Sequence, residues 1–332
     1  MSPAGFGANG PRASVVMCVY NDLRFLDEAV SSVLQQQFAD FEFVIVDDGT
    51  QADTVRRLAA RDPRITVVVN ERNTGAAAAG NHGIAAARSD IIVRLDADDV
   101  AEPARIGCLL AELEREPELG LVGSAVTLID EAGRPHGVQP MPETDVEIRW
   151  TILFHNPFYH SSIAFRRSCF EATGGYKEDE PVAHDHYLWF AMLDGCRARN
   201  LSEPLVRYRV NPRGLTAQHA TGSPRRRTHA IREQLWARLG LTYALYDDEL
   251  AAVISRFLRG FEIDAVRRGP AYEVILTALH AFAAEMRSRA RLGEDDALRR
   301  LVRGLVTRML DERPASSGEQ RRIARLCADL EL

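Results

Sequence analysis

The chain has 332 residues, of which 46% are hydrophobic and 27% charged, so it can bury at least one large core and form about two domains. Its formal net charge of −6 argues against a dedicated nucleic-acid-binding protein, which would usually be basic. No stretch reaches the roughly 20 apolar residues of a membrane-spanning helix, and no secretory signal opens the chain.

The first half of the chain alternates apolar runs with helical stretches. After a Gly/Ala/Pro-rich leader at 1–13, which we expect to be disordered, apolar runs predict strands at 14–20, 41–49, 65–69 and 91–96. Between and after them, helical spacing or small-residue runs predict helices at 21–38, 51–61, 74–88 and 103–116. This alternation predicts an α/β fold with a mostly parallel sheet flanked by helices.

Beyond residue 120 the pattern becomes mixed and then helical. Strands are predicted at 120–130, 161–167 and 204–210, and a helix at 184–193. The stretch QHATGSPRRR resembles a linker, and the remainder is rich in Arg, Ala and Leu at helical spacing. We therefore expect one domain at 14–220 and an α-helical C-terminal region at 221–332.

Polar residues follow each of the first four predicted strands. They are Tyr20, Asp48, Asn73 and the cluster of Asp96, Asp98 and Asp99. Ligands of open α/β sheets bind at the carboxyl ends of the strands, so these groups are expected to face one crevice.

The acidic cluster in RLDADDVAEP allows two interpretations. Asp99 is followed by Glu102 and Pro103, a pattern typical of a helix start with Asp99 as the cap. Asp96 and Asp98 are two residues apart and point the same way in an extended segment, where each raises the pKa of the other unless a cation is present. Hard divalent cations bind carboxylates and diphosphates, so the pair predicts a metal-diphosphate site.

The other strand ends are ambiguous when taken singly. Asp48-Gly49 could form an ordinary turn, or Asp48 could accept a hydrogen bond from a base or ribose. Asn73 could cap the following helix, or contribute its amide to a nucleotide site.

Together these stretches carry a resemblance to a known family. VVMCVYN, FEFVIVDDGT, NERNTGAAAAGNHGI and RLDADDVAEPARI occur in this order, followed by NPFYHSSIAFRRSCFEATGGY, HDHYLW and EPLVRYRVNP. The series spans residues 14–212 and resembles the inverting family-2 glycosyltransferases of GT-A fold, most of all those of bacterial capsule, exopolysaccharide and O-antigen assembly. The helical tail is not covered.

The resemblance implies a hexosyltransferase-type enzyme with a nucleotide-diphospho-sugar donor, usually of UDP, and Mg²⁺ or Mn²⁺. Carried over by motif position, Tyr20 and Asp48 would contact the base. Asp96 would contact the ribose or the metal's water shell, and Asp98 would bind the metal. Asn73 and Arg94 would line the nucleotide pocket.

The resemblance also implies a general base near a helix start. Asp185 keeps that position in HDHYLW, while His184 replaces the usual Glu. Some family members carry a His after RYR, near the metal, where this chain has Asn211. A base must take the proton of the acceptor hydroxyl as it attacks the anomeric carbon, and one base opposite the leaving group inverts that centre.

Several neighbouring residues remain open between ligand contact and ordinary structure. His160 could contact donor phosphate or acceptor, or serve a polar role at a strand start. Trp189 could stack on a sugar or belong to the core. Gly175 is expected in a turn whose backbone approaches the donor, and the run HDH could in principle be part of a transition-metal site.

The remaining residues bear on location and partners. Five scattered cysteines without a CxxC pair suggest reduced thiols, hence a cytoplasmic protein. The Arg-rich tail predicts a solvated helix face or a basic surface that meets anionic lipid at the inner face of the membrane.

The expected partners are the nucleotide-sugar donor and a glycan or lipid-linked acceptor in surface polysaccharide biosynthesis, with no nucleic acid. Two alternatives to the transferase are a non-catalytic nucleotide-sugar-binding protein and a sugar nucleotidyltransferase. The second would normally have a Gly-rich phosphate loop, which VYNDLRFL lacks.

Overall fold

The computed structural model describes residues 10–50, 53–179, 183–212, 233–241, 253–254, 257–258, 265–288, 294–312 and 317–330. The predicted linker and most of the predicted leader lie outside these ranges. The chain divides into two compact units, one with Met1–Glu143 and Phe158–Pro224, the other with Thr144–Pro157 and Arg225–Leu332. Residues 144–157 thus belong with the C-terminal helices.

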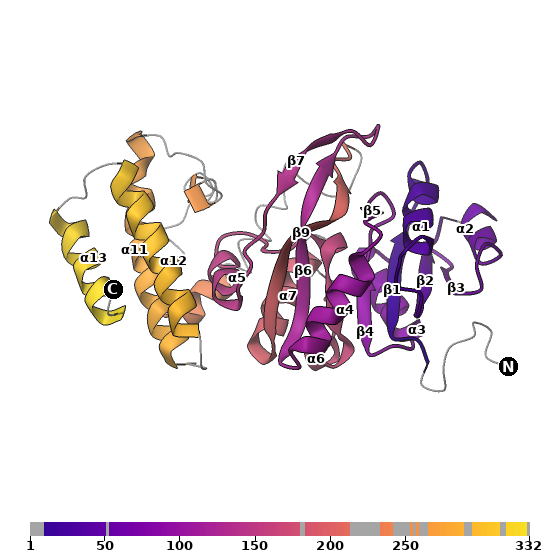
Figure 1. The fold of residues 1–332 in the computed structure, drawn as a ribbon, viewed down its shortest axis with the longest axis horizontal. Coiled ribbons are helices and arrows are strands. Elements are labelled where there is room, and N and C mark those ends of the chain that lie inside the picture. The colour runs from indigo at the N-terminus through magenta and orange to yellow at the C-terminus, as the bar shows by residue number, and fades with distance from the viewer. Residues whose placement is uncertain are drawn as a thin grey trace. The chain divides into compact units, whose positions relative to one another are not determined.

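The described strands of the first unit form one sheet (Figure 1). They are β1 Ala13–Val19, β2 Phe41–Asp48, β3 Ile65–Asn70, β4 Ile91–Arg94, β5 Val100–Ala101, β6 Leu119–Ile129, β7 Pro135–Gln139, β8 Ala164–Arg166 and β9 Arg197–Arg209. Its helices are α1 Leu26–Leu34, α2 Asp53–Leu58, α3 Ala76–Ala86, α4 Arg105–Arg115, α6 Arg167–Ala172 and α7 His184–Gly195, with a 3-10 turn η1 at His160–Ser162.

The sheet is parallel in its first half and mixed beyond β4. Its strand order is β3-β2-β1-β4-β8-β6-β9-β5, with β7 beside β6. The pairs within β3-β2-β1-β4 are parallel, whereas β8 runs antiparallel to both β4 and β6. The predicted α/β fold is confirmed, and the carboxyl ends of β1 to β4 share one edge.

Both faces of the first strands are covered, which explains their uninterrupted apolar sequences. Met17 belongs to the core that includes the apolar residues of α1 and α4, while Val16 on the other face meets α3. A Cβ at Gly83 of α3 would lie 2.6 Å from Val16 Cγ1 and 2.8 Å from Val46 Cγ2. The small-residue helix therefore allows α3 to pack closely on the sheet.

The second unit contains α5 Asp145–Thr151, α11 Ala265–Ser288, α12 Glu294–Glu312 and α13 Ser317–Leu330. Helix α11 contacts both α12 and α13 (Figure 1). Trp150 of α5 packs against Phe282, with ring centroids 5.4 Å apart. Of the helices whose residues are described, none is long and apolar enough to cross a membrane. All five cysteines are free.

Candidate functional site

Three carboxylates follow β4 and differ in their surroundings. Asp96 Oδ1 lies 3.2 Å from His160 Nδ1, and Asp98 Oδ2 accepts a hydrogen bond of 3.0 Å from Asn211 Nδ2. Asp99 is 1% exposed, and its Oδ1 accepts a 2.7 Å bond from the backbone N–H of Arg209.

These surroundings separate the pKa values of the three acids. Burial raises the pKa of Asp98, the Asn211 hydrogen bond opposes the increase, and the charge of Asp96 adds to it. Burial and the charges of Asp98 and Asp96 raise the pKa of Asp99 well above its usual value. Burial would also raise the pKa of Asp96, but His160 and Arg94 outweigh it and hold that pKa below its usual range.

The interpretation of Asp99 as a helix cap is wrong. Helix α4 begins at Arg105 after Ala104, with no side-chain cap. Val100 and Ala101 instead form β5, which pairs with Arg207 and Val206 of β9. Val100 and Ala101 would have begun the first turn of a helix capped by Asp99, but their backbone is paired with β9.

Two buried arginines hold the acidic segment in place, and neither was predicted from the sequence as part of the site. Arg105 is 0% exposed and donates to the carbonyl oxygens of Arg94 and Ser161 at 2.5 and 2.6 Å. Arg209 Nε donates to the Asp98 carbonyl oxygen at 2.8 Å. A sequence signal existed for Arg105 alone, since it shares a helix face with the buried residues Leu109 and Leu113.

His160 connects Asp96 to a second group of side chains. Its Nε2 lies 2.8 Å from Tyr176 Oη, and its ring centroid is 5.7 Å from that of His184. Burial raises the pKa of Tyr176, so the phenol stays protonated at neutral pH and can donate to the imidazole.

Gly175 provides the turn that carries Tyr176. Its φ of 82° lies in the left-handed region, and a Cβ there would lie 2.9 Å from Asn81 Oδ1. The amide of Asn81 in turn fixes the Tyr176 backbone: Oδ1 accepts from its N–H at 3.0 Å and Nδ2 donates to its carbonyl oxygen at 2.9 Å. Gly175 thus lies in a turn as expected, and its approach to a donor stays a prediction.

Helix α7 begins at His184 and Asp185, next to this group. Its N-cap residue, Ala183, has φ 68°, a left-handed conformation that costs about 1–2 kcal/mol outside glycine. Asp185 lies in the first turn, and its Oδ1 accepts from the N–H of His186 at 2.7 Å. A carboxylate there is stabilised by the positive end of the helix dipole.

His184 is expected to make the protein acid-sensitive. Burial lowers its pKa to about 4 from 6.5. Between these values the unfolded chain binds a proton that the folded chain does not, so the free energy of unfolding falls as pH falls through this window. We expect His184→Gln to flatten the decrease by on the order of 1–3 kcal/mol, measured by urea denaturation at a series of pH values from neutral to about 4.5. An unchanged pH slope would contradict the assignment.

The ends of β1 and β2 differ in what they offer to a ligand. Tyr20 is 48% exposed, so its ring is available for a base. Asp48 is buried and its carboxylate is used internally: Oδ1 accepts from Asn70 Nδ2 and from both the N–H and the hydroxyl of Thr74, and Oδ2 from the N–H of Gly75, all at 2.7–3.0 Å.

Asp48 therefore anchors the loop that follows β3. A Cβ at Gly49 would lie 2.4 Å from the Arg72 carbonyl carbon, so only glycine lets this loop pack so closely. Asn73, on the same loop, does not cap α3; its Oδ1 accepts from the N–H of Gly75 at 2.8 Å. The capping interpretation of Asn73 is thus wrong, and its role at a nucleotide stays a prediction.

Asp48→Ala is expected to lower the free energy of unfolding by about 1–3 kcal/mol, because it removes the acceptor of four hydrogen bonds, among them those from the part-buried N–H groups of Thr74 and Gly75. It should also weaken the thermal stabilisation given by a nucleoside diphosphate, since the loop carrying Asn73 would lose its anchor. Asp53→Ala, at an exposed aspartate of α2 paired with Arg57, is the matched control. Equal effects of the two substitutions would contradict the anchoring role.

Arg94 and Trp189 are both buried. Trp189 is 0% exposed and packs against Phe158, so the sugar-stacking hypothesis is corrected in favour of a core role. Arg94 is 2% exposed, and both of its terminal nitrogens lie 3.7 Å from Cys18 Sγ. Among described residues Arg94 Nε has no hydrogen-bond partner.

The acidic segment fits a hard divalent cation that is shared with a ligand. Within the described ranges, no three His, Cys, Asp or Glu side chains are arranged to hold a metal ion by themselves, including the HDH run. Mg²⁺ commonly takes one or two carboxylates and completes its shell with phosphate and water, which needs no such set. Burial and the charge of Asp96 raise the pKa of Asp98, so a bound cation would favour its ionised form.

Comparisons with known proteins identify the family of this chain. A family model described as Glycosyl transferase family 2 matches residues 14–174. The putative glycosyltransferase EpsE of Bacillus subtilis (strain 168) is 32% identical over 210 residues, covering 60% of this chain and 74% of that protein. The chain belongs to glycosyl transferase family 2. The resemblance drawn from the sequence motifs is thereby confirmed.

Other relatives of this glycosyltransferase have named activities. The UDP-Gal:alpha-D-GlcNAc-diphosphoundecaprenol beta-1,3-galactosyltransferase of Escherichia coli is 27% identical, covering 60% of this chain and 75% of that protein. Among solved structures, S. aureus TarS 1–349 in complex with UDP-GlcNAc is similar with a TM-score of 0.57 and 16% identity, covering 82% of this chain and 81% of that chain. This likeness confirms the GT-A fold.

Proposed function

We propose that this chain is a metal-dependent, inverting glycosyltransferase of the hexosyltransferase type. It would move a sugar from a UDP-linked donor to a hydroxyl of a glycan or lipid-linked acceptor in surface polysaccharide biosynthesis. The observation that carries the proposal is the cluster of Asp96, Asp98 and Asp99 just beyond the carboxyl end of β4, in a chain of glycosyl transferase family 2. The names of the relatives support the donor and the acceptor.

The nucleotide would lie over the ends of β1 to β4. Tyr20 would offer its exposed ring to the base, and Asn73 and Asp96 would line the pocket with polar groups. Arg94 supports this proposal because, among the residues that the structure describes, its buried guanidinium has no hydrogen-bonded carboxylate, which suits it to an anionic ligand.

Two carboxylates would divide the chemistry. Asp98 would hold Mg²⁺ or Mn²⁺, which when bound would neutralise charge on the departing diphosphate. Asp185 would accept the proton of the acceptor hydroxyl as that oxygen attacks the anomeric carbon and the bond to the diphosphate breaks. His160 lies beside Asp96, and His184 precedes Asp185 at the start of α7. Their ring centroids are 5.7 Å apart, and both side chains would contact the transferred sugar or the acceptor.

The test is donor turnover. Purified protein with a panel of nucleotide sugars and Mn²⁺ should release nucleoside diphosphate, fastest with a UDP-linked donor, and a chelator should stop the release. Release that continues in the chelator would remove metal dependence from the proposal. Binding of a donor without any release would favour the non-catalytic alternative.

A further inference from the structure

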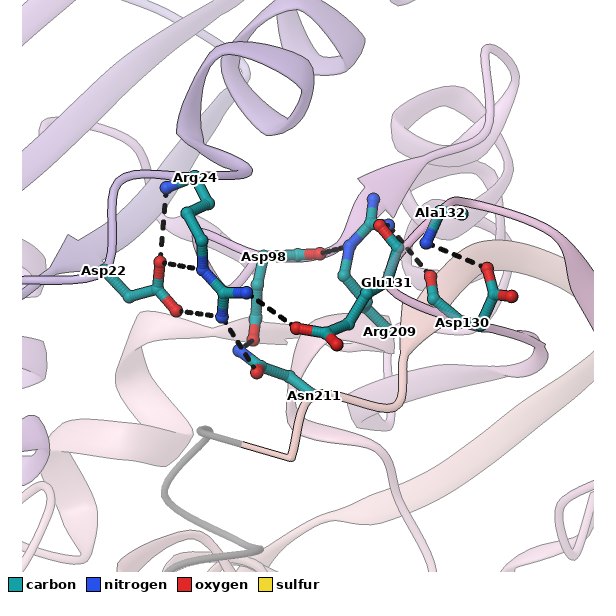
Figure 2. Close-up of polar contacts among 8 residues, drawn as sticks. All are labelled: Asp22, Arg24, Asp98, Asp130, Glu131, Ala132, Arg209 and Asn211. Atoms are coloured by element: carbon teal, nitrogen blue, oxygen red, sulfur yellow. Dashed lines mark hydrogen bonds and ion pairs between the residues drawn. The ribbon is translucent and has the colours of Figure 1, made fainter.

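Asp98 is held by an amide that lies far away in the sequence. Asn211 follows β9, and its Nδ2 donates to Asp98 Oδ2 at 3.0 Å (Figure 2). On its other side, Asn211 Oδ1 accepts from Arg24 Nη2 at 3.2 Å. Arg24 lies between β1 and α1, so the amide bridges two segments at the same edge of the sheet.

Chemistry fixes the orientation of this amide. A guanidinium only donates hydrogen bonds, so the atom of Asn211 that faces Arg24 must be the oxygen. The NH₂ group then faces Asp98, which as a carboxylate accepts. A cation beside Asn211 Oδ1 would also meet the positive charge of Arg24. Asn211 is therefore arranged to orient a carboxylate and not to coordinate a metal ion.

Arg24 is itself fixed from two sides. Its Nε and Nη2 donate to the two carboxylate oxygens of Asp22 at 2.9 and 2.6 Å, and its Nη1 donates to Glu131 Oε1 at 2.6 Å (Figure 2). Hydrogen bonding from Arg24 lowers the pKa of Asp22 to about 2, so the Asp22 carboxylate stays ionised over the physiological range. Because the guanidinium of Arg24 is held by a bidentate contact with Asp22 and an ion pair with Glu131, it is a fixed hydrogen-bond donor for the Asn211 oxygen.

We infer that Asn211 is a positioning residue for Asp98 and that Arg24 acts through it. The β1–α1 segment and the end of β9 would thus set the angle at which Asp98 meets the metal and the diphosphate. The inference rests on the proposed function, because it assumes that Asp98 is the metal ligand. It assigns Asn211 a hydrogen-bonding role at the position where the family resemblance implies a His near the metal in some members.

The experiment is a double-mutant cycle on Mn²⁺ affinity, measured by electron paramagnetic resonance in the presence of UDP and without turnover. Asn211→Ala is expected to weaken Mn²⁺ binding roughly 10-fold, as is typical when a group that orients a metal ligand is removed. Arg24→Gln is expected to weaken it about 3-fold in the wild-type background and to have no effect in the Asn211→Ala background, since both act on one bridge.

The control is Arg61→Gln, which removes a comparable surface ion pair with Asp27, outside the Asn211 bridge. It should leave Mn²⁺ affinity unchanged. Thermal unfolding of every variant verifies that the fold is intact, and Asn211→Ser carries the same expectation should Asn211→Ala not fold.

Each other outcome overturns the inference in a recognisable way. Independent effects of Arg24→Gln and Asn211→Ala would mean that Arg24 does not act through the amide. Tighter Mn²⁺ binding by Asn211→Asp, with no effect of Arg24→Gln, would make position 211 a ligand site. If wild-type protein with UDP binds no Mn²⁺, the metal part of the proposed function fails together with the inference. If wild type binds Mn²⁺ and loses it on Asp98→Asn, but Asn211→Ala is silent, only the inference fails.

Discussion

Asp98→Asn is expected to lower sugar transfer at least about 100-fold and, at the same time, to stabilise the metal-free protein by about 1 kcal/mol. The loss of activity follows from removing the carboxylate that would hold the metal against the diphosphate. The gain in stability follows from the raised pKa of Asp98, which means that folding disfavours its charge. Initial rates with a UDP-linked donor and urea denaturation in a chelator measure the two effects.

The matched control for this prediction is Asp90→Asn, at an exposed aspartate that directly precedes the first residue of β4. It should change neither quantity. If Asp98→Asn destabilises the metal-free protein, or keeps most of its activity, Asp98 is not an uncompensated metal ligand.

Asp185→Asn is expected to lower the turnover rate by roughly 10²–10⁴-fold while leaving the affinity for the donor almost unchanged. The substitution keeps the shape of the side chain and its hydrogen bond from the His186 N–H, but an amide oxygen cannot take the acceptor's proton. Turnover under saturating donor, together with calorimetric titration of UDP, separates the two quantities.

Asp194→Asn serves as the control, because this exposed residue lies near the other end of α7. An Asp185→Asn enzyme that loses donor affinity in proportion to its rate would assign Asp185 to donor binding and leave the general base unidentified.

Local patterns in the sequence were enough to predict β1 to β4 and α1 to α4, but not β5 or β7. Apolar runs covered on both faces marked β1, β2 and β4, and the order of motifs predicted the GT-A fold. The direction of the later strands was not predictable, because β8 joins the sheet antiparallel between β4 and β6. Nothing in a short apolar segment such as Ile163–Arg166 specifies its neighbours.

Residues of the candidate site that follow strand ends could be predicted from the sequence. Contacts between residues far apart in the sequence could not. The acidic segment, His160 and Asp185 were recognisable from their neighbours in sequence. The bridge from Arg24 to Asn211 joins residues 187 positions apart, which no local pattern encodes. The error on Asp99 has the same origin, since Val100 and Ala101 pair with β9, a strand distant in sequence, and do not form a helical turn.

The hydrogen bonds of Asp48 also could not be predicted from its motif. The carboxylate of Asp48, which the resemblance assigns to a base, accepts hydrogen bonds from the loop after β3, so its proposed contribution to nucleotide binding would include holding that loop. Substitutions there are expected to change stability and ligand affinity together, unlike those at Asp185.

The anomeric configuration of the first product tests the account most directly. With Mg²⁺, a UDP-linked donor and water as the acceptor, proton NMR can follow the released sugar before its anomers equilibrate. A single base at Asp185 with a diphosphate leaving group held through Asp98 predicts that the sugar first appears with the configuration opposite to that of the donor. First appearance of the donor's own configuration would contradict the inverting mechanism and the roles assigned to both carboxylates.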